Sequence, residues 1–294
     1  MPLPIFTGPF SINDTDPPLN IQFLHLPQNL SALCHTGKEL IVFVISSPSQ
    51  IAQRSAIRKT WATDASHKTS IIFHLGLEKP SNSATGNLTE DISKERMQYD
   101  DIIVSNVVED YYNLTWKTYA TIAFTSLYCQ QAKCVLKSDS DTVVNIPAME
   151  KLCNKTNSLS ILGNCGIHWP IRDPGSKWFT PTWVWSGVYP KFCLGSAYML
   201  VGSNAARQLL AHVNKTKFFR SANFRKMGED VVWTGIVAEK AQIDRAHTLG
   251  FSPESNANFH CFADGEKAAL TVHYIRGLRS IIERWKFVRK PRKC

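Results

Sequence analysis

The chain has 294 residues, of which 44% are hydrophobic, so it can bury a sizeable core and is not an intrinsically disordered protein. Its formal net charge of +9 admits a nucleic acid, a membrane surface or an anionic small molecule as partner. Basic residues are spread thinly before the run at 284–293, and the sequence lacks the aromatic and basic repeats typical of nucleic-acid readers. An anionic substrate is therefore favoured, and no nucleic acid is expected as partner.

The first 36 residues are rich in Pro, Asn and Asp without a sustained period, which predicts a stem or irregular leader at 1–36. One globular domain is expected over 37–294. No stretch approaches the roughly 20 apolar residues of a membrane span, and the N-terminus lacks a charged segment followed by an apolar run. If the protein enters the secretory pathway, its membrane anchor or targeting segment is expected outside this sequence.

The cysteines and glycosylation sequons concern the cellular compartment. None of the eight cysteines forms a C-x₂-C pair, which argues against a zinc finger and leaves either scattered thiols or a disulfide framework, with Cys294 a candidate for an unpaired thiol. Chance would supply roughly one or two Asn-x-Ser/Thr sequons. The six present favour disulfides and the secretory pathway, and they are Asn13, Asn29, Asn87, Asn113, Asn154 and Asn214.

The β-branched and aromatic run at 39–47 predicts a strand buried on both faces. The helical stripe that follows places Arg54 and Arg58 four residues apart on one face, which suits either an anion site or a solvated basic surface. Strands at 70–76 and 101–105 then alternate with helices at 92–99 and 113–131. This alternation predicts an α/β fold with a Rossmann-like, mostly parallel sheet flanked by helices.

A buried strand over Val135 and Leu136 leads directly into Asp139 and Asp141. The carboxyl ends of parallel strands are where such sheets bind ligands, and residues two apart on a strand point to the same side. Paired carboxylates suit Mg²⁺ or Mn²⁺ shared with a substrate phosphate, although an Asp-x-Asp also occurs in solvated loops. Lys137 adds a positive charge beside them.

After a helix at 147–153 and a short strand at 160–163, the segment 167–189 is irregular and dense in Trp, Pro and Gly. Long loops of this kind are often functional, and tryptophan faces stack on the apolar faces of sugars. The alternative is a satellite core beneath the loop, which should account for at least two of its four tryptophans. These are Trp169, Trp178, Trp183 and Trp185.

A strand at 189–201 and a helix at 204–213 precede a second acidic pair, Glu229 and Asp230, which opens an apolar run. Carboxylates at a helix N-terminus are stabilised by its dipole, so ordinary capping is one interpretation. A general base acting on a hydroxyl is the other, and it requires desolvation to offset the dipole's effect on the pKa. His247, His260 and His273 follow, and one histidine would complete a metal site begun by acids.

Six blocks of sequence share motifs with a single family. They are RSAIRKTWA (54–62), DIIVSNVVEDYYNLTWKT (101–118), KSDSDTVVN (137–145), PIRDPGSKW (170–178), YPKFCLGSAYML (189–200) and GEDVVWTGI (228–236). In this order they resemble the β1,3-glycosyltransferases, which include β1,3-galactosyltransferases and β1,3-N-acetylglucosaminyltransferases and are Golgi type II membrane enzymes with a signal anchor. The resemblance covers roughly residues 39–285 and implies a GT-A fold.

The resemblance also implies roles for individual residues. Asp141 would be the main ligand of Mn²⁺ or Mg²⁺ on a UDP-sugar, supported by Asp139, and Asp230 would be the general base. His273 is the best match to a metal-binding histidine, with His260 as the alternative. The donor-binding residues would be Arg54, Arg58, Lys137, Asp139 and Asp141.

The implied activity is inverting transfer of a hexose or N-acetylhexosamine, most often galactose or GlcNAc, to a glycan on a glycoprotein or glycolipid in β1,3 linkage. The resemblance also implies a lumenal Golgi location, and it is compatible with a homo-oligomer. Two departures concern Ser140, which replaces the middle acid of the metal motif, and the sequence after Val231, which bears on the acceptor. The rivals are a catalytically silent glycan-binding homologue and a metal-dependent phosphoesterase.

Overall fold

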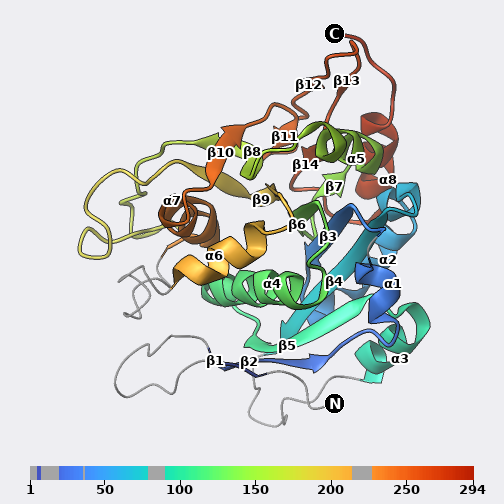
Figure 1. Ribbon diagram of the computed structural model, residues 1–294, viewed down its shortest axis with the longest axis horizontal. Coiled ribbons are helices and arrows are strands. Elements are labelled where there is room, and N and C mark those ends of the chain that lie inside the picture. The colour runs from blue at the N-terminus through green and yellow to red at the C-terminus, as the bar shows by residue number, and fades with distance from the viewer. Residues whose placement is uncertain (1–4, 8–19, 36, 79–89, 214–226) are drawn as a thin grey trace.

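One large sheet organises the computed structural model, which describes residues 5–7, 20–35, 37–78, 90–213 and 227–294 (Figure 1). The order of its nine strands is β1 (Ile5–Thr7), β2 (Asn20–His25), β5 (Ile102–Val108), β4 (Thr69–Leu77), β3 (Leu40–Ile45), β6 (Cys134–Asp139), β9 (Phe192–Val201), β8 (Ser160–Gly166) and β10 (Asp244–His247). Strands β5, β4, β3 and β6 run parallel, as predicted. The flanks are mixed, since β9 is antiparallel to both β6 and β8 and only β10 is again parallel to its neighbour.

Side chains of β3 alternate between two hydrophobic layers because successive residues of a strand point to opposite faces. Ile41 and Phe43 pack in one layer, and Leu40, Val42 and Val44 pack in the other. The first layer includes the helical segments α4 (Leu114–Tyr128), α6 (Ala205–Val213) and a π-helical segment, Val231–Val237, continued by α7 (Ala238–Lys240). Those of the second are α2 (Ile51–Arg58), α3 (Glu90–Tyr99), α5 (Ile146–Lys155) and α8 (Leu278–Val288).

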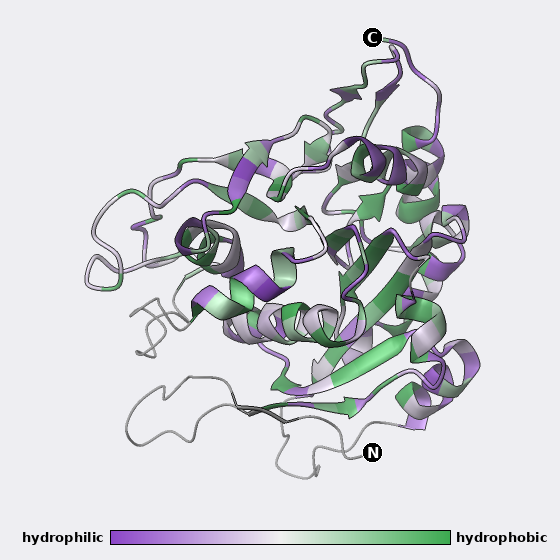
Figure 2. Cartoon of the chain, viewed as in Figure 1, coloured by the Kyte–Doolittle hydropathy of each residue, from purple (hydrophilic) through white to green (hydrophobic). Residues whose placement is uncertain are grey.

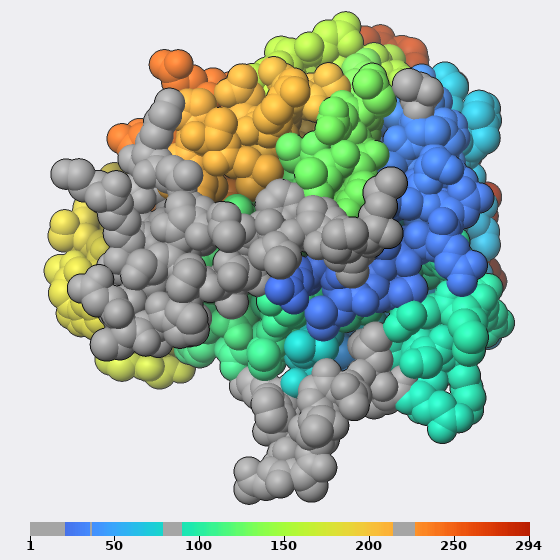
Figure 3. All heavy atoms as spheres, turned by 60° about the horizontal axis from the view of Figure 1, so that its bottom comes forward, coloured from blue at the N-terminus to red at the C-terminus, as the bar shows by residue number. Residues whose placement is uncertain are grey.

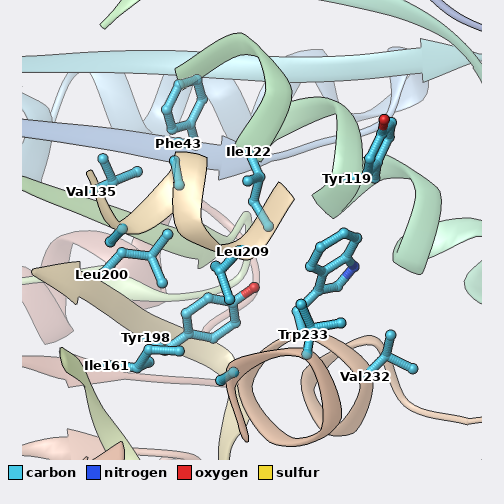
Figure 4. Packing of buried hydrophobic residues seen from close by; sticks show 14 of the residues in the cluster. Phe43, Tyr119, Ile122, Val135, Ile161, Tyr198, Leu200, Leu209, Val232 and Trp233 are labelled. Atoms are coloured by element: carbon cyan, nitrogen blue, oxygen red, sulfur yellow. The ribbon is translucent and has the colours of Figure 1, made fainter. Parts of the chain in front are cut away.

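The hydropathy of the chain follows these layers. The central strands are mostly green in Figure 2, whereas the helices that flank the sheet carry purple turns. Figure 4 shows the first layer from close by, where Ile122 points toward Leu209 and Trp233. Both strand faces are therefore buried, as the unbroken apolar run at 39–47 predicted.

Part of the expected leader belongs to the sheet. Strand β2 pairs with β5, Ile21 and Phe23 are fully buried, and α1 (Leu30–Cys34) follows. The period-2 pattern of these two apolar residues is a strand signal that the neighbouring Pro and Asn residues obscured.

All eight cysteines form disulfides, including Cys294, which the sequence had left as a candidate for an unpaired thiol. The pairs are Cys34–Cys129, Cys134–Cys153, Cys165–Cys193 and Cys261–Cys294. Such a framework is typical of proteins that fold in an oxidising compartment. Among the described helices, none combines the length and the apolar character needed to cross a bilayer.

A small second sheet brings the C-terminal part of the chain to the end of β6. Strand β14 (Thr271–Val272) lies between β11 (Phe251–Ser252) and β7 (Val143–Val144), which directly follows the Asp139–Asp141 stretch. The N–H of Ile275 also donates to the carbonyl of Asp141 at 2.8 Å. A hairpin of β12 (His260–Cys261) and β13 (Lys267–Ala268) lies beside the C-terminus (Figure 1).

Candidate active site

Asp139 ends β6, and Asp141 follows in the turn before β7, at the carboxyl end of the parallel strands. One ligand atom each from Asp139, Asp141 and His273 lie within 4.8 Å of one another. Oxygen and imidazole donors at this spacing suit a divalent cation such as Mn²⁺ or Mg²⁺. The structure therefore brings together the three residues that the motifs implied, and His260 lies in the β12–β13 hairpin instead.

The orientation of His273 suits a metal ligand. Its Nδ1 lies 2.9 Å from the carbonyl oxygen of Pro253, and because a carbonyl only accepts, Nδ1 carries the proton. Nε2 thus faces Asp141 at 3.1 Å and Asp139 at 3.8 Å. Burial alone favours the neutral ring, but its hydrogen bonds with Asp141 and Pro253 outweigh burial and raise the pKa of His273. Holding one ring nitrogen by a backbone carbonyl is a common way to aim the other at a metal.

A pocket of about 500 Å³ adjoins this cluster. Tyr274 and Arg276, which follow His273, line it together with residues of α8, including Arg284 and Phe287. The guanidinium of Arg276 lies 3.6 Å from the carboxylate of Asp141 and is 80% exposed, so it is available to an anion. Sequence reasoning missed Arg276, since nothing in its spacing connects it to the aspartates.

Lys137 is buried and joins two carboxylates. Its Nζ lies 2.7 Å from Asp139 and 2.8 Å from Glu229, and it also donates to the carbonyl of Gly195. Burial opposes the ammonium charge, but these two carboxylates outweigh it and raise the pKa of Lys137. The lysine therefore connects the metal-type cluster to the second acidic pair, rather than presenting a free charge to a ligand.

Glu229 is held on several sides by buried groups. Thr118 of α4 donates to it at 2.9 Å and the hydroxyl of Tyr198 donates at 3.3 Å, in addition to the ion pair with Lys137. Both hydroxyls escaped the sequence analysis, because they come from a helix and a strand whose pairing with Glu229 depends on the fold.

Asp230 caps the π-helical segment, as one interpretation of the sequence expected. Its Oδ1 accepts from the N–H of Val231 and its Oδ2 accepts from the N–H of Gly195, each at 2.9 Å. Burial raises the pKa of the Asp230 carboxyl to about 6, and the charge of Glu229 acts in the same direction, against the two N–H donors and Lys137. A carboxylate with this pKa is suited to accept a proton near neutral pH.

Gly195 fits this position because it has no side chain. A Cβ there would lie 3.1 Å from Oε1 of Glu229 and 3.3 Å from Oδ2 of Asp230. Its backbone also serves both groups, since its carbonyl accepts from Lys137 and its N–H donates to Asp230.

The two arginines predicted to bind an anion are engaged within the protein. Arg54 is fully buried, and its guanidinium donates to both oxygens of Glu95 and to Ser46, Ser47 and Pro48. These bonds occupy all five of its N–H donors. Arg58 pairs with Asp101 and with Glu95. Their geometry fits a positioning role better than a direct contact with a ligand.

What the arginines position is the loop after β3, which borders the Asp139–Asp141 turn. Ser140 donates to Gln50 at 3.1 Å, and the side-chain amide of Gln53 donates to the carbonyl of Ser140 at 2.8 Å. The serine that replaces a middle acid is thus used to fasten the turn, while the flanking aspartates remain in the cluster.

Comparisons with known proteins point to one family. The model of the galactosyltransferase family matches residues 52–249. β1,3-Galactosyltransferase 5 from Gorilla gorilla gorilla is 33% identical over 193 residues, which are 64% of this chain and 63% of that protein. Human β1,3-galactosyltransferase 2 is 33% identical over 70% of this chain and 48% of its own length. Mouse β1,3-galactosyltransferase 1 is 28% identical over 80% of this chain and 70% of its own length. The chain thus spans between 48% and 70% of the length of these relatives.

Two solved structures resemble the chain at low identity. The galactosyltransferase LgtC in complex with donor and acceptor sugar analogs gives a TM-score of 0.43 at 11% identity, over 85% of this chain and 96% of that one. The bifunctional glycosyltransferase WbbM gives 0.45 at 12% identity, over 86% and 50%.

Proposed function

Since this chain belongs to the galactosyltransferase family, we propose that it transfers a hexose or N-acetylhexosamine from a UDP-sugar to a glycan acceptor. The donor sugar is galactose or GlcNAc, the new linkage is β1,3, and the anomeric configuration is inverted. The acceptor glycan belongs to a glycoprotein or a glycolipid. Mn²⁺ or Mg²⁺ is the cofactor.

The observation that carries this proposal is the pairing of a metal-type cluster with a nearby base. Asp139, Asp141 and His273 supply donors suited to a divalent cation, and Arg276 beside them offers a further positive charge. Lys137 and Gly195 connect this cluster to Asp230. The metal-type cluster and Arg276 would bind the nucleoside diphosphate, and Asp230 would accept the proton of the attacking hydroxyl.

The cation, when bound, would offset the negative charge that develops on the UDP leaving group. Asp230 accepts the proton of the acceptor hydroxyl. At the same time the oxygen of that hydroxyl forms a bond to the anomeric carbon, and the bond from that carbon to the UDP oxygen breaks. Lys137 and the N–H of Gly195 hold the carboxylates of the two groups in place during this displacement. Arg276 lies where it can bind the diphosphate.

We place the enzyme in the secretory pathway, on the lumenal side of the Golgi membrane. The four disulfides and the sequons support an oxidising, glycosylating compartment. Attachment to the membrane would require a segment other than those described.

The test is UDP release by the purified protein with Mn²⁺ and a panel of UDP-sugars, with and without β-linked acceptor sugars. Asp141→Ala is the test variant. Asp264→Ala is the matched control, because Asp264 is a surface carboxylate paired with Lys151. We expect one donor to support release that an acceptor stimulates and that only Asp141→Ala abolishes. Metal-dependent UDP binding without release from any donor would identify a silent homologue instead.

A further inference from the structure

The strongest concentration of charge in the chain lies at its C-terminal end, and most of it belongs to residues that the site described above does not use. The segment 276–294 contains eight basic residues and one acidic residue, so it holds a net charge of +7 of the chain's +9. This segment consists of Arg276, helix α8 and the tail that follows the helix. The basic run noted in the sequence therefore calls for a partner of its own.

The basic region lies at the outside of the molecule. Figure 1 places α8 and the C-terminus beside the β12–β13 hairpin, and the red atoms of this region reach the right and upper margins of Figure 3. The yellow segment 167–189 lies across the molecule from them. It carries the exposed Trp169, Trp178 and Trp183, and only Trp185 is partly buried, where at least two tryptophans were expected in a satellite core. The exposed aromatic surface and the basic surface are therefore separate.

Three lysines of the basic region lack an acidic partner. Lys286, Lys290 and Lys293 are exposed, and none of them forms an ion pair with the described part of the chain. The dipole of α8 favours a cation in the last turn of the helix, where Lys286 lies, but this effect fades beyond that turn, where Lys290 and Lys293 lie. Lys286 and Lys290 are four residues apart across the end of the helix, a spacing at which like charges repel each other. An external anion would relieve this repulsion.

The carboxylates of α8, of the β12–β13 hairpin and of the turn at Asp64 already have cationic partners. The pairs are Glu283–Arg279, Asp64–Arg289, Asp264–Lys151 and Glu266–Lys151. None of these described carboxylates is left to neutralise the three lysines. The positive charge of this surface is therefore directed to solvent.

The tail that carries Lys293 is fixed to the rest of the protein. Cys294 forms a disulfide with Cys261, and the carbonyl of Arg292 accepts from the N–H of Lys267 at 2.9 Å. The guanidinium of Arg292 lies 4.5 Å from the ring centre of Phe287. A surface that is already ordered loses little conformational entropy when it binds a ligand.

The chemistry of this surface favours a sulfated polysaccharide over a membrane. Helices that bind the surface of a bilayer bury apolar side chains in it. Ile281 and Val288 of α8 are only 1% and 2% exposed, since they pack in the second hydrophobic layer, and the exposed Leu278 lies at the opposite end of the helix from the lysines. Clustered basic residues without an apolar anchor suit a hydrophilic polyanion. The four disulfides favour a secretory compartment, where such a polyanion is a polysaccharide rather than a nucleic acid.

We infer that Lys286, Lys290 and Lys293 form a binding surface for a sulfated polysaccharide chain. Its sulfate groups pair with the three ammonium groups, and the chain runs from the last turn of α8 along the tail. The pocket beside Asp141 is lined by other residues of α8, among them Arg284, and by none of these lysines. The surface is therefore distinct from the proposed donor site.

The test measures the affinity of the purified protein for immobilised heparin at several salt concentrations. We expect the wild type to bind, the affinity to fall steeply as salt rises because each ionic contact releases counterions, and desulfated heparin not to bind. The double variant Lys286→Gln/Lys290→Gln should lose about tenfold in affinity, because two ionic contacts are removed. Lys286→Arg/Lys290→Arg keeps both charges and should retain the binding.

The matched control is Lys94→Gln/Lys240→Gln, which removes the same charge from exposed positions on α3 and α7. We expect this control to bind heparin within about twofold of the wild type. An equal loss in both glutamine variants would overturn the inference, because it would show a response to net charge alone. Elution of the wild type from heparin below about 0.15 M salt would also overturn it.

A membrane partner is tested with vesicles of phosphatidylcholine that contain phosphatidylserine. Tighter binding to these vesicles than to heparin, lost in Lys286→Gln/Lys290→Gln, would replace the polysaccharide by a membrane and overturn the inference. The outcome is independent of sugar transfer. A protein that binds heparin through these lysines but releases no UDP from any donor would refute the proposed function and support this inference.

Discussion

Replacing Asp230 by asparagine gives the sharpest test of the proposed chemistry, because it removes the proposed proton acceptor while keeping the shape of the side chain. The amide oxygen of the new side chain can still accept from the N–H of Val231 or Gly195, so the fold around the π-helical segment should persist. Loss of a general base typically lowers turnover by about 10²–10⁴-fold. We expect that loss in kcat, with the affinity for UDP and Mn²⁺ within about twofold of the wild type.

The pKa of Asp230 sets how strongly kcat/KM of the wild type should depend on pH. With a pKa of about 6, Asp230 is mostly ionised at pH 7. One unit below the pKa, at about pH 5, only about a tenth of it is ionised, so kcat/KM should fall to about a tenth of its plateau. Activity is lost as the pH falls, because the protonated acid cannot accept the acceptor's proton.

The Glu229→Gln variant tests whether the acidic limb of kcat/KM reports the ionisation of Asp230 or a structural defect. The charge of Glu229 raises the pKa of Asp230, so its removal should move the acidic limb of kcat/KM to lower pH. A structural defect would lower activity at every pH without moving the limb. Turnover of Asp230→Asn within about tenfold of the wild type, or a wild-type profile that is flat between about pH 5 and 8, would refute the reasoning.

Three further predictions concern the metal site, the fold and glycosylation. Asp141→Ala should abolish the Mn²⁺-dependent part of UDP binding in a calorimetric titration, and an unchanged titration would remove Asp141 from the metal site. Arg54→Ala should lower the free energy of unfolding by about 3–5 kcal/mol in denaturant titrations, because it leaves the buried Glu95 without its bidentate partner, and a loss below about 1 kcal/mol would contradict this. Site-resolved mass spectrometry of secreted protein should find a glycan on the exposed Asn154 and none on Asn113. The side-chain amide of Asn113 donates to the carbonyl at the end of β5, so full occupancy of Asn113 would contradict the structure.

The α/β fold could be predicted because its signals are local. The apolar run at 39–47 and its alternation with helices predicted the parallel centre of the sheet, and the ordered motifs implied the fold family. The antiparallel direction of β9 could not be predicted, since it depends on how the segment 167–189 returns the chain to the sheet. The local sequence pattern determines that a strand forms, whereas the path of the long connection before it determines the direction of that strand in the sheet.

The arginines show the same limit at the level of a site. Spacing predicted that Arg54 and Arg58 share one face of a helix, and they do. Whether that face meets a ligand, water or other side chains is decided by Glu95 and Asp101, which lie far along the chain from their partners. Without those partners in view, an anion site and an internal ion-pair network give the same local pattern.

Lys137 links the metal-type cluster to the acidic pair Glu229 and Asp230. Sequence reasoning placed it near the nucleotide as a positive charge, yet its ammonium lies between Asp139 and Glu229 and is itself buried. Without it, the buried carboxylate of Glu229 would lose its ion pair and would face the partly exposed carboxylate of Asp139 with no cation between them. The lysine therefore fixes the distance between the group that would bind the leaving group and the group that would bind the nucleophile. An in-line displacement depends on that distance, so in the proposed reaction Lys137 would act by holding the carboxylates in place.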